Sequence, residues 1–190
     1  MNIINTKIPE VFILEPHVFA DDRGWFMESF NQQTFADICH QQQIDIPSFV
    51  QDNHSLSNRG VLRGLHYQLP PFAQGKLVRV VQGRAWDVAV DIRQHSPTFG
   101  QWVSAELSAK NHQQLWIPAG FAHGFLALED NTQFLYKTTS YYNKDSERTI
   151  VWNDKDLAIA WPVADLALKL TDKDSDGASF AQAITNADVF

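Results

Sequence analysis

Short segments rich in β-branched and aromatic residues recur along most of the chain, and turn-forming residues separate them. Asp22-Arg23-Gly24 and Gln82-Gly83 are two such turns. This pattern is typical of β-strands joined by tight connections. The segments that predict strands are residues 11–16, 25–30, 49–55, 76–82, 84–93, 101–107, 114–119, 123–129, 133–142 and 149–154. Many strands with little helix between them favour a β-sandwich or a β-barrel.

One of these segments, residues 85–92, alternates between two kinds of side chain. One face of the predicted strand holds the apolar residues Trp86, Val88, Val90 and Ile92. The other face holds Asp87, Ala89 and Asp91. Because side chains of a strand point alternately to its two faces, this pattern predicts a half-buried strand whose second face carries carboxylates.

Two segments have the periodicity of a helix instead. In residues 31–43, Asn31 is a suitable N-cap, and Phe35, Ile38 and Cys39 fall on one side. Residues 177–187 predict a second helix near the end of the chain. The chain is therefore expected to be mainly β, with a few short helices.

The length and composition are those of one ordinary folded domain. The chain has 190 residues, of which 44% are hydrophobic and 19% charged, enough to bury a core without covalent cross-links. No repeat or linker divides it, so we expect a single domain over residues 1–190. Cys39 is the only cysteine, which excludes an intramolecular disulfide and a cysteine-rich metal site.

The charge and hydropathy of the chain argue against two classes of partner. The net charge is −7 and no segment is strongly basic, so we expect no nucleic acid partner. No apolar run reaches the roughly 18 residues of a membrane span. We therefore expect a cytoplasmic protein with no membrane partner. A few converging arginines could still bind a small anionic ligand in a cleft.

Residues 60–83 and 118–123 follow the spacing of the metal-binding cupin motifs, but two ligand positions are changed. In the pattern G-x5-H-x-H-x3,4-E-x6-G, His66 takes the first ligand position, Gln68 the second, and Lys76 replaces the glutamate after a longer gap. Of the later pattern G-x5-P-x-G-x2-H, "PAGFAH" keeps Pro118, Gly120 and His123 at the same spacing. This spacing predicts a cupin-type jelly-roll barrel or sandwich.

The changed ligands predict a site without a metal. Only His66 and His123 remain as ligands, whereas a catalytic zinc usually has three from the protein. Lys76 would place an ammonium group where a divalent cation would sit. A fixed positive charge can stabilise an oxyanion as a metal does. We expect neither a metal nor a cofactor.

Several segments, taken in order, resemble the landmarks of the dTDP-4-dehydrorhamnose 3,5-epimerases, metal-free cupin enzymes of dTDP-L-rhamnose synthesis. They are "RGWFMESF", "FVQDNHS", "GVLRGLHYQ", "QGKLVRVVQG", "SPTFGQW", "WIPAGFAHGF", "FLYKTTSYY" and "LTDKD". The resemblance covers about residues 3 to 175 and is specific because separate motifs agree. It implies an isomerase that inverts C3 and C5 of dTDP-4-dehydro-6-deoxy-D-glucose through enolate intermediates, giving dTDP-4-dehydro-L-rhamnose.

The resemblance also implies catalytic roles. His66 would be the base, since an imidazole with a pKa of about 6.5 is partly neutral near pH 7. Lys76 would stabilise the enolate oxygen at C4, and Tyr136 would return a proton from the opposite face. Asp174, which ends "LTDKD", would orient His66. The sequence leaves Asp172 as an alternative for that role, and this chain has Thr171 where the family pattern has serine.

For the nucleotide sugar, the resemblance implies a set of binding residues and a homodimer. An arginine suits the diphosphate because its planar fork can hold two oxygens, and an aromatic ring suits the thymine face. The early strands could cross to the partner subunit. The implied set is Arg23, Phe26, Glu28, Gln51, Asn53, Arg63, His123, Tyr141 and Lys173.

Other functions remain open on the sequence. A related enzyme could invert only C3 or only C5 of such a sugar, or act as a 3,4-ketoisomerase. A cupin that binds sugar nucleotides without catalysis would keep the arginines and aromatic residues but would not need a histidine–aspartate pair or Lys76. A metal-dependent cupin enzyme is disfavoured by Gln68 and Lys76. Tyr136 favours the double epimerisation, which needs a proton donor opposite the base.

Overall fold

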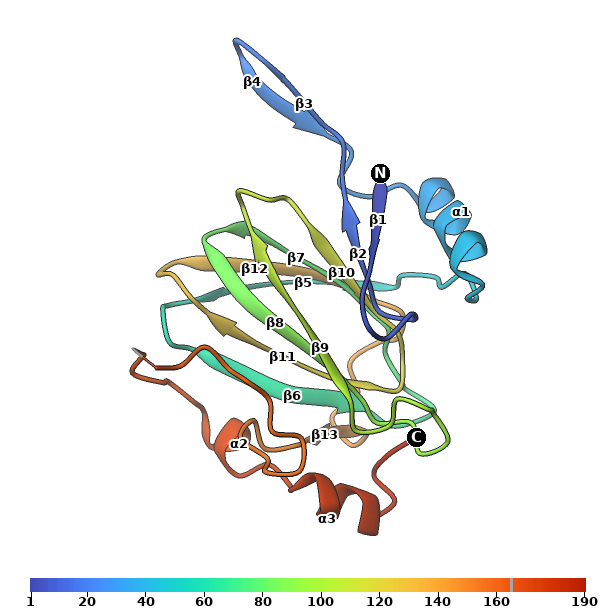
Figure 1. Ribbon diagram of the computed structural model, residues 1–190, viewed down its shortest axis with the longest axis vertical. Coiled ribbons are helices and arrows are strands. Elements are labelled where there is room, and N and C mark those ends of the chain that lie inside the picture. The colour runs from blue at the N-terminus through green and yellow to red at the C-terminus, as the bar shows by residue number, and fades with distance from the viewer. Residues whose placement is uncertain (165) are drawn as a thin grey trace.

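The computed structural model describes residues 1–164 and 166–190, and its main body is two antiparallel β-sheets packed face to face (Figure 1). The six-stranded sheet has the order β1 (Asn2–Asn5), β2 (Phe12–Glu15), β10 (Gln114–Ile117), β7 (Lys76–Gln82), β12 (Thr132–Thr138) and β5 (Gln51–Ser57). The five-stranded sheet has the order β13 (Glu147–Thr149), β6 (Leu62–Gln68), β11 (Phe121–Ala127), β8 (Arg84–Asp91) and β9 (Trp102–Ser108). The predicted mainly β, cupin-type fold is confirmed.

Apolar side chains from both sheets fill the space between them. Phe134 of β12 and Phe125 of β11 stack with ring centroids 4.2 Å apart, which joins the two sheets at the centre of this core. Val78 and Val80 of β7 and Leu107 of β9 are also buried here. Burying this apolar surface favours the folded state by roughly 25 cal/mol for each Å² removed from water.

Each sheet is covered on its outer face by a different part of the chain. The helix α1 (Gln32–Gln42) lies beside the six-stranded sheet, where its buried residues Phe35, Ile38 and Cys39 pack with Trp116. The C-terminal segment, with α2 (Asp172–Ser175) and α3 (Phe180–Thr185), covers the five-stranded sheet (Figure 1). Among the described residues, no helix is both long enough and apolar enough to cross a membrane.

Both predicted helices are confirmed. The side chain of Asn31 caps α1, since its Oδ1 accepts hydrogen bonds from the backbone N–H groups of Gln33 and Thr34 at 2.9 and 3.2 Å. Such a cap satisfies donors that have no partner within the first turn. The helix α3 lies within residues 177–187 and has Ser179 as its cap.

The prediction that the strand at residues 85–92 is half-buried was wrong. Trp86, Val88 and Val90 face the C-terminal segment, whereas the opposite face points between the sheets. Both carboxylates of that second face, Asp87 and Asp91, are 0% exposed. The alternation therefore separates two buried environments, one of which contains charge.

A hairpin of β3 (Val18–Asp21) and β4 (Gly24–Met27) projects from the sandwich (Figure 1). Its aromatic side chains Phe19, Trp25 and Phe26 are 59%, 58% and 68% exposed. Exposed aromatic residues on a projecting element are typical of a surface that binds another chain or a ligand.

Candidate active site

A cavity of about 270 Å³ opens between the two sheets, beside the apolar core. The five-stranded sheet contributes residues of β6 and β11 to its lining, and the six-stranded sheet contributes residues of β7 and β12. The predicted site residues that line it are Arg63, His66, Lys76, His123, Tyr136 and Lys173. Residues that are far apart in the sequence are thus brought together at one concave site.

His66 of β6 lies next to Asp174 of α2. The Nε2 of His66 is 2.8 Å from Oδ1 of Asp174, close enough for an ion pair although not aligned as a regular hydrogen bond. Asp174 is 3% exposed, and its carboxylate also accepts hydrogen bonds from the Gly64 backbone N–H at 2.9 Å and the Thr171 hydroxyl at 2.6 Å. The carboxylate is therefore held in one position against the imidazole.

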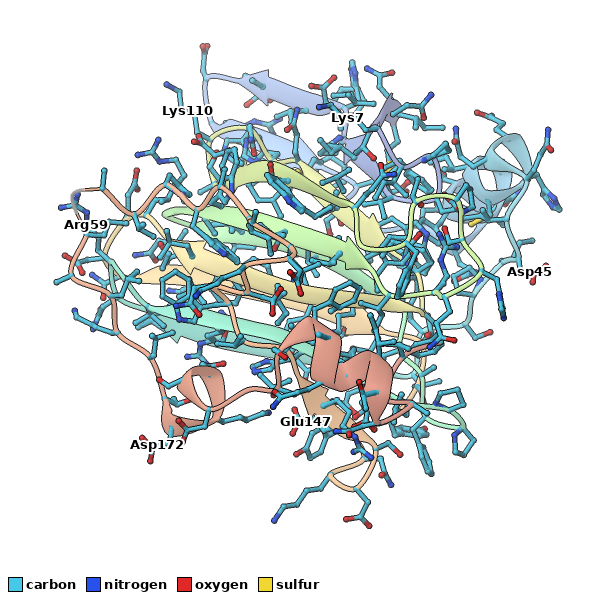
Figure 2. All side chains as sticks on the ribbon, turned by 60° about the horizontal axis from the view of Figure 1, so that its bottom comes forward. Lys7, Asp45, Arg59, Lys110, Glu147 and Asp172 are labelled. Atoms are coloured by element: carbon cyan, nitrogen blue, oxygen red, sulfur yellow. The ribbon has the colours of Figure 1, made fainter. Side chains whose placement is uncertain are left out.

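Asp172, the alternative partner, lies on the other side of the same short helix. It is exposed, and Figure 2 shows it pointing away from the sheets. The structure thus brings Asp174 rather than Asp172 to His66. The helix α2 itself was not expected from the sequence, and its capping box between Thr171 and Asp174 uses the same carboxylate that meets His66.

Burial and nearby charges set the protonation of this pair. Burial lowers the pKa of His66 below its ordinary value, and Lys173 and Lys76 lower it further, whereas Asp174 opposes the shift. Burial alone would raise the pKa of Asp174, but the contacts with His66, Gly64 and Thr171 hold it well below the usual range. A neutral imidazole beside an ionised carboxylate is the state that a general base requires.

Lys76 of β7 places an ammonium group in the same cavity. The side chain is 7% exposed, and its Nζ donates a hydrogen bond to the backbone carbonyl of His66 at 3.2 Å. Burial lowers the pKa of Lys76 to about 8, although the carboxylates of Asp87 and Glu147 oppose the shift. The group is still mostly protonated near neutral pH, where it can stabilise a nearby oxyanion.

A second histidine–aspartate pair lies on the five-stranded sheet. His123 of β11 is directly opposite His66 in the strand pairing, and its Nε2 is 3.0 and 3.1 Å from the two carboxylate oxygens of Asp87. Burial raises the pKa of Asp87, while His123 and Lys76 oppose the shift. Asp87 was not among the site residues predicted from the sequence. The signal that could have found it is the alternation that puts carboxylates on one face of β8.

Tyr136 of β12 enters the cavity from the six-stranded sheet, whereas His66 enters from the five-stranded sheet. Burial raises the pKa of its phenol, so the hydroxyl stays protonated at neutral pH. A proton acceptor and a proton donor therefore come from opposing sheets to one cavity. This arrangement can remove a proton from one face of a bound molecule and return one to the other face.

Other predicted residues lie at the edge of the cavity or outside it. Gln51 donates a hydrogen bond to Asn53 at 2.9 Å, and Asn53 lines a neighbouring cavity of about 420 Å³. Tyr141 is 65% exposed and does not line the cavity of His66, whereas Tyr142 does. Tyr142 is 54% exposed but contributes to the lining of the cavity, so it joins the candidate residues, and Tyr141 stays a prediction.

The structure does not bring Arg23, Phe26 and Glu28 to this cavity within one chain. Arg23 and Phe26 belong to the projecting hairpin, where Arg23 pairs with Asp21, and Glu28 accepts a hydrogen bond from Asn31 at 3.0 Å. Figure 1 shows this hairpin extending away from the sheets that form the cavity.

The side chains in the cupin ligand frame do not suit a metal ion. The Gln68 amide is bonded to backbone groups, and Lys76 is a cation. Within residues 1–164 and 166–190, no three histidine, cysteine, aspartate or glutamate side chains are grouped as metal ligands. Usual catalytic metal sites have three protein ligands. The arrangement is one of acid–base groups and a fixed positive charge.

Comparison with known proteins gives the family. The family model for dTDP-4-dehydrorhamnose 3,5-epimerase matches residues 5–182. A dTDP-4-dehydrorhamnose 3,5-epimerase of Shigella flexneri is 57% identical, over 96% of this chain and 98% of the relative.

Two solved structures are also similar. The dTDP-6-deoxy-D-glucose-3,5-epimerase of Legionella pneumophila, in complex with dTDP-4-keto-L-rhamnose, is 48% identical with a TM-score of 0.89, covering 95% of this chain and 93% of that one. A 3'-monoepimerase of Streptomyces bikiniensis, in complex with dTDP-quinovose, is 33% identical with a TM-score of 0.89, covering 97% and 91%. The chain belongs to the dTDP-4-dehydrorhamnose 3,5-epimerase family.

Proposed function

We propose that this protein is an isomerase that inverts C3 and C5 of dTDP-4-dehydro-6-deoxy-D-glucose, giving dTDP-4-dehydro-L-rhamnose for dTDP-L-rhamnose synthesis. The observation that carries the proposal is the cavity with His66 and Asp174 on one side and Tyr136 on the other, in a chain of this family. The high identity to the relative from Shigella flexneri supports the same reaction.

The first step is removal of a proton from a carbon next to the C4 ketone. We assign the imidazole proton to Nε2, which lies 2.8 Å from the Asp174 carboxylate, so that Nδ1 accepts the proton from carbon. The electron pair of the broken C–H bond moves to the C4 oxygen and forms an enolate. Lys76 stabilises this oxygen with its charge.

The second step returns a proton to the same carbon from the opposite face. Tyr136 donates its phenolic proton to the enolate carbon, and the C4 ketone forms again with the carbon inverted. The tyrosinate must regain a proton before the next inversion, and the protonated His66 must lose one. Repeating the two steps at the other carbon next to the ketone gives inversion at both C3 and C5.

We further propose that the active form is a homodimer in which the β3–β4 hairpin completes the cavity of the partner subunit. Phe19, Trp25 and Phe26 expose apolar surface on an element that leaves its own sandwich. Arg23, Phe26 and Glu28, which the family resemblance assigns to the substrate, lie away from the cavity of their own chain. A hairpin contributed by a second copy would account for both features.

The location in the cell and the bound nucleotide sugar belong to the same proposal. We expect a cytoplasmic enzyme that binds a dTDP-sugar, with Arg63 and Lys173 near the diphosphate and Tyr142 near the thymine. The complex of the relative from Legionella pneumophila with dTDP-4-keto-L-rhamnose supports a ligand of this class.

Inversion at C3 alone is the second candidate, because the monoepimerase of Streptomyces bikiniensis has the same fold. Incubation with dTDP-4-dehydro-6-deoxy-D-glucose in deuterated water separates the two, since each inverted carbon gains deuterium from the solvent. The proposal expects deuterium at both C3 and C5, detected by NMR. Deuterium at C3 only would assign the monoepimerase reaction. If the protein binds the substrate but neither carbon gains deuterium, it binds the nucleotide sugar without catalysing inversion.

A further inference from the structure

The segment between β12 and β13 is held to the sandwich by three glutamine side chains. Residues 140–143 have no regular secondary structure, yet each of these four residues has one backbone group hydrogen-bonded to a glutamine amide. The bonds are Gln74 Nε2 to Ser140 O at 2.8 Å, Gln68 Nε2 to Tyr141 O at 3.1 Å, Tyr142 N to Gln51 Oε1 at 3.1 Å, and Asn143 N to Gln68 Oε1 at 2.7 Å. We call residues 140–143 the tyrosine loop.

Gln68 is at the centre of these contacts. Its side chain is 3% exposed, and besides the two bonds to the tyrosine loop its Nε2 donates to the backbone carbonyl of Phe72 at 2.6 Å. The amide therefore uses both of its N–H donors and its oxygen. It connects β6 to the tyrosine loop and to the connection that leads into β7 and Lys76.

Glutamine is the residue type that this position needs. Its amide offers two donors and an acceptor on one side chain. A neutral histidine has a single N–H, and an ionised glutamate has no donor at all. At the place of the second histidine of the cupin metal frame, the side chain serves two backbone carbonyls and one backbone N–H.

The tyrosine loop in turn places an aromatic ring in the active-site cavity. Tyr142 lines the cavity, and its hydroxyl donates to Glu147 at 3.1 Å. Glu147 also pairs with Lys173, the residue next to Asp174. The position of the Tyr142 ring therefore depends on backbone groups that Gln68 and Gln51 hold.

We propose that Gln68 is a positioning residue for substrate binding, which fixes the tyrosine loop so that Tyr142 forms a wall of the site for the dTDP part of the substrate. This inference rests on the proposed function. Gln68 acts through the loop and not on the reacting carbons, so its loss weakens binding much more than it slows the chemical steps.

The test is Gln68→Met, which keeps the length of the side chain and removes every hydrogen bond. Binding of dTDP is measured by calorimetry, and KM and kcat are measured with dTDP-4-dehydro-6-deoxy-D-glucose. Because partly buried backbone groups of the loop lose their partners and the loop moves, we expect the dTDP dissociation constant and KM to rise about tenfold. The value of kcat should stay within about threefold of the parent, since His66 and Tyr136 are untouched.

Two further variants keep the proposal falsifiable. Leu157→Ala removes a buried apolar side chain from the core beneath the C-terminal segment and lowers the melting temperature without touching the tyrosine loop. It should leave dTDP binding unchanged, which separates loop position from general stability. Gln74 lines the edge of the same cavity, and Gln74→Met removes its hydrogen bond to Ser140 while keeping the length of the side chain, so it should weaken dTDP binding in the same direction by about threefold. If Gln68→Met does not fold, dTDP binding by Gln74→Met tests whether the position of the tyrosine loop controls binding.

The outcomes are distinct. Normal dTDP binding by Gln68→Met, or normal binding by Gln74→Met where the first variant does not fold, would overturn the role of Gln68. An equal loss of binding in Leu157→Ala would overturn it too, because stability would then explain the effect. If the parent binds dTDP but does not exchange C3 or C5 protons, the proposed reaction fails while the binding role of Gln68 is still tested by calorimetry.

Discussion

Asp172 and Asp174 differ by two positions in the chain and have opposite surroundings. Asp174 is buried 2.8 Å from His66, and Asp172 is exposed on the outer side of α2. We expect Asp174→Asn to slow exchange of the C3 and C5 protons about 100-fold or more, because the amide cannot stabilise the imidazolium. The matched control Asp172→Asn should stay within about twofold of the parent. Equal damage from both, measured by NMR in deuterated water, would contradict the pairing.

Two titratable side chains of the site, His66 and Lys76, predict a bell-shaped pH dependence of kcat/KM. His66 must be neutral, and because burial lowers its pKa, activity should fall with decreasing pH only below the ordinary value of 6.5. Lys76 must be protonated, and because its pKa is lowered to about 8, activity should fall as the pH rises through that value. Lys76→Arg stays charged in this range and should lose the alkaline limb. If Lys76→Arg keeps the same fall in kcat/KM at alkaline pH, that fall comes from the titration of another group.

Tyr136→Phe separates proton removal from inversion. The substitution keeps the ring against Phe134 and removes one hydroxyl, so the variant should fold with an unchanged melting temperature. His66 can still exchange protons from its own face, with Lys76 holding the enolate, but no donor remains on the other face. We expect deuterium incorporation with little product inverted at C5. Inversion at the parent rate would place the proton donor elsewhere.

Among the elements, the sequence predicted those whose residues show a local pattern, such as a helix cap or alternation between two faces. The helix α1 was predicted from the Asn31 cap and the apolar side of residues 31–43. The strand β8 was predicted from the alternation of apolar and polar side chains. The burial of β8 could not be predicted, because alternation distinguishes two faces without saying what covers each. The short helix α2 spans only Asp172–Ser175, too few residues for a period. The family resemblance therefore pointed to Asp174, but the sequence left Asp172 open as an alternative.

The capping of α2 links this element to catalysis. The Thr171 hydroxyl donates to Asp174 at 2.6 Å and helps to lower the pKa of that carboxyl. Thr171→Val keeps the shape of the side chain but loses this bond, so we expect kcat to fall about threefold to tenfold and the melting temperature to drop by a few degrees. Thr171→Ser keeps the hydroxyl and should match the parent in both measurements. A loss of activity in the serine variant would show that the methyl group, and not the hydrogen bond, matters.

At the scale of the whole molecule, the packing of the two sheets forms the cavity, and this packing could not be predicted from the sequence. His66 and Tyr136 come from different sheets, and only the family resemblance joined them before the structure did. The same resemblance implied Tyr141, which stays a prediction, and only the structure added its neighbour Tyr142 to the cavity lining. Asp87 was missed because its role depends on the strand pairing that sets β8 beside His123. The single domain over residues 1–190 stays a prediction.

The proposed exchange of hairpins between subunits can be tested by complementation. His66→Ala should inactivate the cavity of its own subunit, whereas Arg23→Ala should impair the cavity of the partner subunit. A mixed dimer then has one intact cavity, which combines the normal His66 of one chain with the normal Arg23 of the other.

Equal amounts of the two inactive variants, unfolded and refolded together, should form about half mixed dimers with one active site in two, and so recover about 25% of the parent activity. Each variant refolded alone is the control and should stay inactive. If the hairpin instead serves its own chain, every mixed dimer has one cavity without His66 and one without Arg23, and no activity returns. Size-exclusion chromatography of the refolded mixture confirms that dimers have formed, so an inactive dimer would contradict the exchange itself.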